Sequence, residues 1–342
     1  MARRAARATP IAPVVWRDGV HLTDTPIWCD ARRRQDICFV SSVERIPRTG
    51  HGQLIATPAT LALLGSTDGH LGVPVRQRFT LGTVRLELIP SGRGLGAAAL
   101  FADIAGRKVL YANTVRTVAG GAGEPAEVRS CDALVVGATF GEKHHVFPPL
   151  ARVIEETVAW ASAQLAANRR PVLFVDGILD GLEVAKTLLD RGVIVSAHRA
   201  IREAATRGSI AGIATVGKEP RAVIWLDGDH AGLAKAMRGD SANGAGKRTR
   251  PSSDVARNSG RASSTGFATA LVSGRAVEDG VGYDAAFAWA TAADRAQLLG
   301  WIEAANARSV FVTGPCADAI AAAVGAHARV IGPPQQMALF AR

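Results

Sequence analysis

The chain has 342 residues, of which 48% are apolar and 20% are charged, so it is long enough for two domains and can bury a sizeable core. Its formal net charge of +10 favours a polyanionic partner, with nucleic acid as the obvious candidate, although an Arg- and Ala-rich composition can also be basic without binding anything. No apolar run reaches the ~18 residues of a membrane span, and the basic N-terminus lacks the apolar stretch of a secretory signal, so we expect a cytoplasmic protein with no membrane partner. The four cysteines are scattered and lack CxxC spacing, so we expect reduced thiols.

The first half of the chain alternates short apolar runs with Gly and Pro turns. Residues 1–15 form an Arg-rich lead that we expect to be flexible. Residues 79–89 alternate in polarity, which predicts a strand or a hairpin. Residues 97–104 and 108–112 flank Ala105-Gly106-Arg107, and this arrangement predicts two strands joined by a tight turn.

From residue 150 the pattern changes to alternating helices and strands. Residues 150–165 and 181–189 carry apolar residues at helical spacing. Residues 171–175, 193–195 and 222–226 are short apolar runs typical of buried strands. Strand–helix alternation of this kind indicates a parallel sheet.

Residues 239–266 differ from everything around them. They are rich in Ser, Gly, Ala and Arg and have almost no apolar residues, so they cannot bury enough surface to become ordered. Five basic side chains make this loop positive: Lys247, Arg248, Arg250, Arg257 and Arg261. Such a loop could contact a phosphate backbone without reading its sequence. Alternatively, it could be an insertion that adds length without any function. Beyond it we predict helices over residues 295–305 and 317–324 and a strand over 309–313.

Two stretches near the N-terminus, residues 30–47 and 55–64, resemble the opening of the β-CASP metallo-β-lactamase nucleases, in particular the bacterial DNA ligase-associated exonucleases. In that family a strand ending in Phe-Val-Ser leads into His-x-His-x-Asp-His, which supplies most ligands of two zinc ions. Here the same frame reads Ser42-Val-Glu44-Arg-Ile46-Pro47, with no histidine.

Later landmarks of the family follow in the same order, and together they extend the resemblance from about residue 16 to residue 340. Most of them lack the residue that would contact metal. The replaced positions are Arg93 in the family's His turn, Thr114 at its bridging Asp, Gly137 at an acid, and Ala292 and Gly314 at two further histidines. Asp30 and Asp294 keep their acids.

The resemblance implies an α/β fold made of a metallo-β-lactamase αββα sandwich with an inserted β-CASP α/β domain. The sandwich would comprise residues 16–149 and 270–342, and the insertion would comprise residues 150–269, including the basic loop. The family also implies zinc. A catalytic zinc needs about three protein ligands, and a two-metal nuclease needs about twice as many. Because Asp30, Glu44 and Asp294 cannot supply them, we expect no metal, no other cofactor and no catalytic residue.

The loss of the metals would leave carboxylates without their counter-charges, and a buried, unpaired carboxylate is costly. The planar guanidinium of Arg93 can bind a carboxylate through two hydrogen bonds. We therefore predict that Arg93 fills the vacated position and pairs with Asp30 or Glu44. The alternative is that Arg93 is a solvent-facing loop residue.

Three functions compete on this basis. The first is a non-catalytic nuclease homologue that binds nucleic acid or a partner, such as an active paralogue, in DNA repair or RNA processing. The second is an active exonuclease with a rebuilt site, and the third is a protein-only scaffold for a DNA ligase or helicase. The candidate nucleic-acid-binding residues are Arg32, Arg33, Arg34, Lys247, Arg248 and Arg250.

Two other clusters are weaker candidates for a site. His144 and His145 follow Glu142, but adjacent side chains rarely point the same way. Asp227-Gly-Asp229-His230 follows a predicted strand, where such a cluster is more typical of a turn and helix cap.

Overall fold

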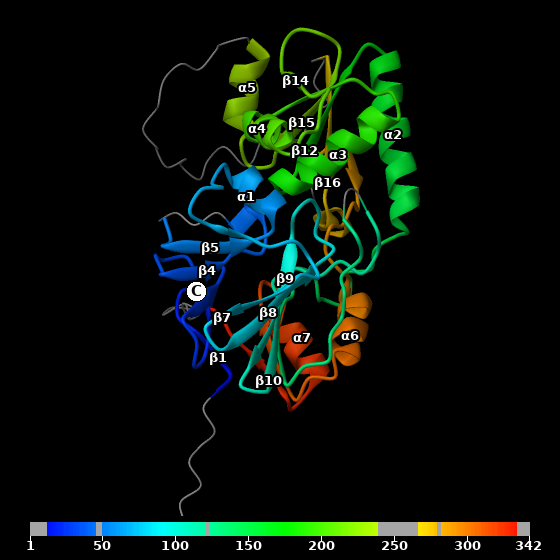
Figure 1. Ribbon diagram of the computed structural model, residues 1–342. Helices are drawn as coiled ribbons and strands as arrows, with labels where there is room; N and C mark the ends of the chain where they lie inside the picture. Colours follow the sequence, from blue (N-terminus) through cyan, green and yellow to red (C-terminus); the bar gives the residue numbers. More distant parts are fainter. Residues whose placement is uncertain (1–11, 46–49, 121–122, 239–265, 279–281, 334–342) are drawn as a thin grey trace, which may run out of the picture.

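The computed structural model describes residues 12–45, 50–120, 123–238, 266–278 and 282–333. These residues form three β-sheets with helices packed against them (Figure 1). The mixed α/β class predicted from the sequence is therefore confirmed. Within the described ranges, no helix is both long enough and apolar enough to cross a membrane.

The first sheet has the strand order β1-β2-β3-β4-β5-β6. Its strands are β1 (Val14–Trp16), β2 (Val20–Leu22), β3 (Ile27–Cys29), β4 (Ile37–Phe39), β5 (Gln53–Ala56) and β6 (Leu71–Gly72). The 3-10 turn η1 (Val43–Arg45) follows β4, and helix α1 (Pro58–Leu64) follows β5. Leu61 of α1 packs against the outer face of this sheet.

The second sheet has the order β19-β18-β11-β10-β9-β8-β7. Its strands are β7 (Arg78–Leu81), β8 (Val84–Pro90), β9 (Ala98–Ile104), β10 (Arg107–Ala112), β11 (Ala133–Gly137), β18 (Ser309–Thr313) and β19 (Ala328–Val330). Strands β7 to β10 pair antiparallel, whereas β10, β11, β18 and β19 pair parallel. Helices α6 (Arg295–Ala304) and α7 (Ala317–Val324) lie on one face of it.

These two sheets face each other across a shared apolar core. Ile27 and Phe39 of the first sheet meet Leu88, Leu100 and Phe311 of the second. Because side chains alternate between the faces of a strand, the neighbouring residues of the second sheet point the other way, onto α6 and α7. The layers therefore run helix, sheet, sheet, helix. All four cysteines are buried and free, and burial raises the pKa of the Cys38 thiol to about 12.

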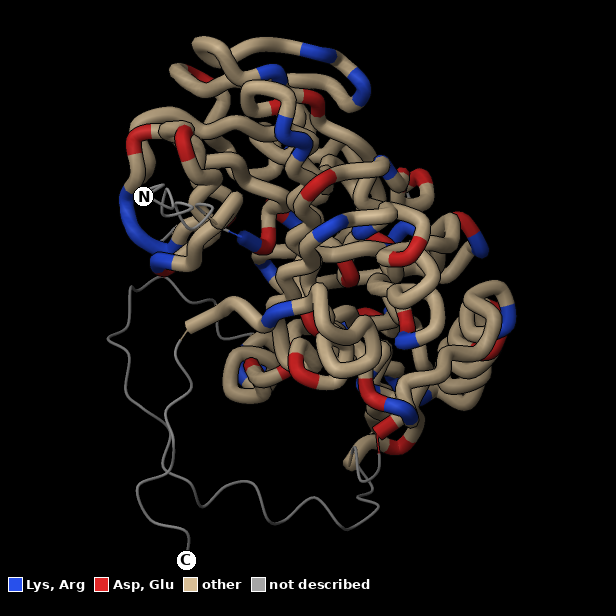
Figure 2. Tube along the Cα trace, turned by 90° about the horizontal axis from the view of Figure 1, so that it is seen from below, with Lys and Arg blue, Asp and Glu red and all other residues tan. Residues whose placement is uncertain are grey.

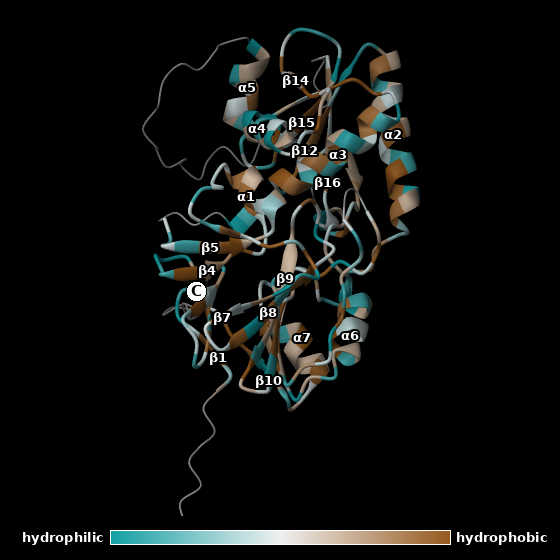
Figure 3. Cartoon of the chain, viewed as in Figure 1, coloured by the Kyte–Doolittle hydropathy of each residue, from teal (hydrophilic) through white to brown (hydrophobic). Residues whose placement is uncertain are grey.

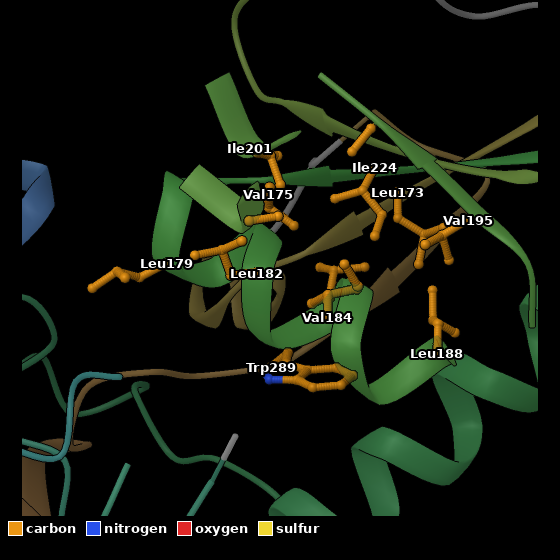
Figure 4. Close-up of a cluster of buried hydrophobic side chains, with 14 of the residues drawn as sticks. Leu173, Val175, Leu179, Leu182, Val184, Leu188, Val195, Ile201, Ile224 and Trp289 are labelled. Carbon is orange, nitrogen blue, oxygen red and sulfur yellow. The ribbon is translucent and has the colours of Figure 1, made fainter. Parts of the chain in front are cut away.

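The third sheet is parallel throughout, with the order β14-β13-β15-β12-β16-β17. Its strands are β12 (Arg170–Val175), β13 (Val195–Ala197), β14 (Ala214–Thr215), β15 (Ala222–Leu226), β16 (Phe267–Val272) and β17 (Ala285–Phe287). Its helices are α2 (Leu150–Ala166), α3 (Ile178–Asp190), α4 (Arg199–Arg207) and α5 (His230–Arg238), and the 3-10 turn η2 (Gly274–Val277) follows β16. Helices α2, α3 and α4 cover one face, and α5 covers the other. Figure 4 shows Leu182, Val184 and Leu188 of α3 against Leu173 of β12 and Ile224 of β15.

The predicted elements agree well with the observed ones. The turn between β9 and β10 places Ala105 and Gly106 at φ +52° and +88°, as a tight hairpin requires. The third sheet continues to Phe287, beyond the boundary expected at residue 269, because β16 and β17 pair with it. The division into domains stays a prediction. The lead over residues 1–11 and almost all of the basic loop lie outside the described residues.

Candidate functional site

The first two sheets meet along one edge, where β3 and β4 end beside the carboxyl ends of the parallel strands β10, β11 and β18. This edge holds two cavities, of about 720 and about 650 Å³. Both are lined by Asp30, Arg32 and Arg45, and we call them together the cleft. Ligands of parallel sheets characteristically bind at the carboxyl ends of the strands, so the cleft is the candidate functional site.

Asp30 lies in the cleft with its carboxylate already hydrogen-bonded. The backbone amide of Ser41 donates to Oδ1 at 2.8 Å. The Ser41 hydroxyl and the Tyr111 hydroxyl both donate to Oδ2, at 2.6 and 2.8 Å. Burial raises the pKa of the Asp30 carboxyl in spite of these donors and the charge of Arg45.

Arg93 joins Glu44 to helix α3. Its guanidinium donates two hydrogen bonds of 3.0 Å to Asp180 and one of 2.7 Å to Glu44. Thr291 adds a hydroxyl donor to Asp180 at 2.6 Å. The predicted pairing with Glu44 is confirmed, while Asp30 is satisfied by other groups. The alternative of a solvent-facing Arg93 is wrong, because only 11% of its side chain is exposed.

The three charges of this network affect one another. Burial would raise the pKa of Asp180, but the Arg93 guanidinium and the Thr291 hydroxyl hold it below its usual value. Burial raises the pKa of Glu44, which has less help from donors. The other Glu44 oxygen accepts the backbone amide of Leu179 at 3.1 Å. Glu44 therefore caps the first turn of α3, a helix that has no side-chain cap of its own.

Two of the replaced positions have no room for a metal ligand. A Cβ atom on Gly137 would lie 1.7 Å from the backbone oxygen of Asn113. Gly314 has φ +104°, and its Cβ would lie 2.8 Å from the backbone oxygen of Ala138. An acid at the first position or a histidine at the second would force the strand ends apart.

The remaining motif positions are dispersed. Ser42 is buried and follows Ser41, the residue that binds Asp30, and Thr114 follows β10 without a side-chain hydrogen bond among the described residues. Ala292 lines a different, more apolar cavity. Asp294 is the N-cap of α6, where it forms a capping box with Gln297. Ile46 and Pro47 lie outside the described residues.

The residues of the site do not fit a two-zinc centre. Every oxygen of Asp30, Glu44 and Asp180 already accepts a hydrogen bond, and a guanidinium lies between two of these carboxylates. Across the described ranges, no group of three or more His, Cys, Asp or Glu residues could hold a metal ion.

The cleft carries charges of both signs. Its lining includes three arginines and four acids: Arg32, Arg33, Arg45, Asp18, Asp30, Glu44 and Asp318. Arg32 lines both cavities, and its side chain has no hydrogen-bond or ion-pair partner among the described residues. Arg45 donates to Asn113 at 3.3 Å and faces the same space. Arg33 lines the second cavity but pairs with Asp18, and Arg34 is exposed outside both cavities.

Charges of both signs are also mixed over the rest of the molecule (Figure 2). Figure 2 shows basic and acidic residues interspersed over most of the trace. Residues 1–11 and 239–265 contain eight Lys and Arg but only two acidic residues. These segments, with the predicted contacts Lys247, Arg248 and Arg250, lie outside the described residues.

Sequence reasoning missed the contribution of α3. Its Glu183 binds the fully buried Arg116 through two hydrogen bonds of 2.8 and 2.9 Å and accepts the Trp289 indole N–H at 2.9 Å. Asp180 and Glu183 are three residues apart, on the face of the helix that carries its buried apolar residues. That spacing was a signal that the helix carries buried carboxylates, but it did not reveal their partners.

The two weaker clusters have structural roles. The Nδ1 atom of His145 accepts the backbone amides of Gly141 and Glu142 at 3.0 and 3.1 Å. Asp229 accepts the backbone amide of Gly232 at the start of α5, so the predicted helix cap is confirmed.

The chain is distantly homologous to a protein of Opitutus terrae described as a probable DNA ligase. The two are 24% identical over 343 residues, which cover 96% of this chain. The match spans only 32% of the longer relative. No known protein-family profile matches this chain.

Proposed function

We propose that this protein is a catalytically degenerate member of the β-CASP metallo-β-lactamase nucleases that binds nucleic acid in its cleft without cutting it. Its setting would be DNA repair or RNA processing, beside a DNA ligase or an active paralogue. The observation that carries the proposal is the exchange of metal ligands for an ion-paired Arg93, while Arg32 and Arg45 still face an open cleft.

Three further findings support it. Two sheets face each other with helices outside them, and a third, parallel sheet packs beside them, as the family's architecture requires. The distant homology extends over nearly the whole chain, and the relative is described as a probable DNA ligase. Because this chain matches about one third of that protein, we propose that it corresponds to one module of a ligase-containing assembly.

The arginines would bind phosphate oxygens. Guanidinium groups bind phosphate through two hydrogen bonds and keep their charge. The hydrogen bond to Asn113 restricts the Arg45 side chain at the cleft, so phosphate binding would cost less side-chain entropy. Such contacts are independent of base sequence, so affinity should fall steeply with salt.

The test is a binding titration with a labelled single-stranded oligonucleotide, repeated at several salt concentrations. Each lost phosphate contact reduces the salt slope by about 0.7 for single strands, so the double variant Arg32→Gln/Arg45→Gln should reduce it by about 1.4. The control is Lys186→Gln/Lys218→Gln, which removes the same charge from exposed positions far along the chain. Equal slopes in both variants would reject the cleft as the binding site.

The same samples test catalysis. We expect the oligonucleotide to remain intact after prolonged incubation with zinc or manganese. Its shortening by the unaltered protein would support the rival hypothesis of a rebuilt nuclease site. An absence of binding would favour the protein-only scaffold.

A further inference from the structure

One face of the second sheet is covered at one end and open at the other. Ile89, Ala99 and Leu110 point to this face and pack beneath α6 and α7. Along the same strands the alternation brings Arg85 and Lys108 to the same face, beyond the helices. Figure 3 shows hydrophilic residues at the lower ends of β8 and β10, where this face is open.

This open end is hollowed and mostly basic. A cavity of about 530 Å³ is lined by Arg78, Arg85, Lys108 and Arg129, with Phe101 among them. We call these five residues the sheet-end patch. Two acids also line the cavity. Glu87 is buried and paired with Arg78 and Arg129 at 3.2 and 2.9 Å, and Asp103 accepts the backbone amide of Gly106.

Two cations of the patch are available to a partner. Arg85 and Lys108 lie opposite Asp103 on either side of it in the strand register, yet neither forms an ion pair with it. Their side chains are exposed and have no hydrogen-bond or ion-pair partner among the residues that the structure describes. The four cations that line the cavity outnumber its two acids, so the patch has a net positive charge even though Glu127 also pairs with Arg129.

Phe101 adds an aromatic ring. It lies opposite Glu87 on β8 and Leu110 on β10, packs at the rim of the core beneath α6 and α7, and is partly exposed. A partly exposed aromatic ring among cations suits unpaired bases, which stack on it while their phosphates contact the cations. In a duplex the bases are stacked inside the helix and cannot stack on Phe101. A duplex would therefore bind only through its phosphates, like any other polyanion.

We propose that the sheet-end patch is a docking surface for single-stranded nucleic acid. The inference rests on the proposed function for the kind of ligand, but it uses a surface separate from the cleft. Lys108 and Asn113 lie near opposite ends of β10, about 17 Å apart at ~3.4 Å per residue. The two surfaces therefore make separable contributions.

The test compares two variants with the control Lys186→Gln/Lys218→Gln. The double variant Arg85→Gln/Lys108→Gln breaks no ion pair of the described structure, and it should reduce the salt slope for a single strand by about 1.4. Phe101→Leu keeps an apolar side chain at the core rim but removes the ring. It should weaken single-strand binding about tenfold and leave duplex binding unchanged.

Melting temperatures verify that each variant is folded. Photo-crosslinking of the unaltered protein to a single strand gives a second reading, with attachment expected in residues 98–104. The proposal is overturned if the Arg85→Gln/Lys108→Gln variant binds like the control, or if Phe101→Leu affects single strands and duplexes alike. If the sheet-end variants weaken binding while Arg32→Gln/Arg45→Gln does not, the proposed binding in the cleft is rejected and the proposed docking surface at the sheet-end patch is supported.

Discussion

Arg93 is the residue on which the rebuilt site depends. Its guanidinium binds the buried Asp180 and the partly buried Glu44, and neither carboxylate accepts a hydrogen bond from another cation among the described residues. Arg93→Ala would leave both carboxylates without a counter-charge and should lower the free energy of unfolding by about 3–5 kcal/mol. Arg93→Lys should lose less, because it keeps the charge but not the two-pronged geometry.

Urea unfolding measures this difference. Arg152→Ala on α2 is the matched control, since its ion pair with Glu156 is exposed to solvent and should contribute little to stability. If Arg93→Ala and Arg152→Ala had similar effects, the ion pairs of Arg93 would not stabilise the fold.

The environment of His145 predicts how the stability of the protein responds to acid. Burial, followed by the charge of His144, lowers its pKa below 6.5. Its Nδ1 atom can be protonated only if the hydrogen bonds from Gly141 and Glu142 break. His145 therefore binds a proton more readily in the unfolded chain than in the folded protein. The contribution of neutral His145 to the free energy of unfolding is complete above pH ~6.5 and is lost as the pH falls.

The measurement is the free energy of unfolding at pH 7.5 and at pH 5.5. Stability should decrease on acidification in the unaltered protein. It should decrease less in His145→Gln, whose side-chain oxygen can still accept an amide. An equal decrease in both proteins would assign the acid sensitivity to other groups, such as His51 and His198, whose pKa values burial also lowers.

At the scale of elements, α3 joins the third sheet to the sandwich. Asp180 binds Arg93, Glu183 binds Arg116, and Glu44 caps the first turn of the helix. All three partners come from the first 116 residues. We therefore expect the third sheet and the two facing sheets to unfold together.

Glu183→Gln tests this joint. The change keeps the shape of the side chain and leaves Arg116 buried without its counter-charge, which should cost about 3–5 kcal/mol. Glu203→Gln on α4 is the control, because its partner Arg199 is exposed and the pair should contribute little to stability. A loss no greater than that of the control would show that this pair does not hold the two parts together.

At the scale of the whole molecule, the sequence predicted the elements better than their partners. Apolar periodicity placed α2, β15, β18 and α7 within a residue or so, because burial on one face dictates spacing. The same periodicity carries no information about long-range pairs. The family resemblance named Glu44 as a partner of Arg93, because its motifs place both residues at metal positions, but Asp180, 87 residues from Arg93, was not recognised.

We propose that ion pairs and hydrogen bonds occupy the positions at which the resembling nucleases bind metal. Elemental analysis of the purified protein, after equilibration with zinc and manganese and removal of the free ions, tests it most directly. We predict far less than one ion per chain, because each candidate carboxylate already has its donors. About two ions per chain would contradict the account.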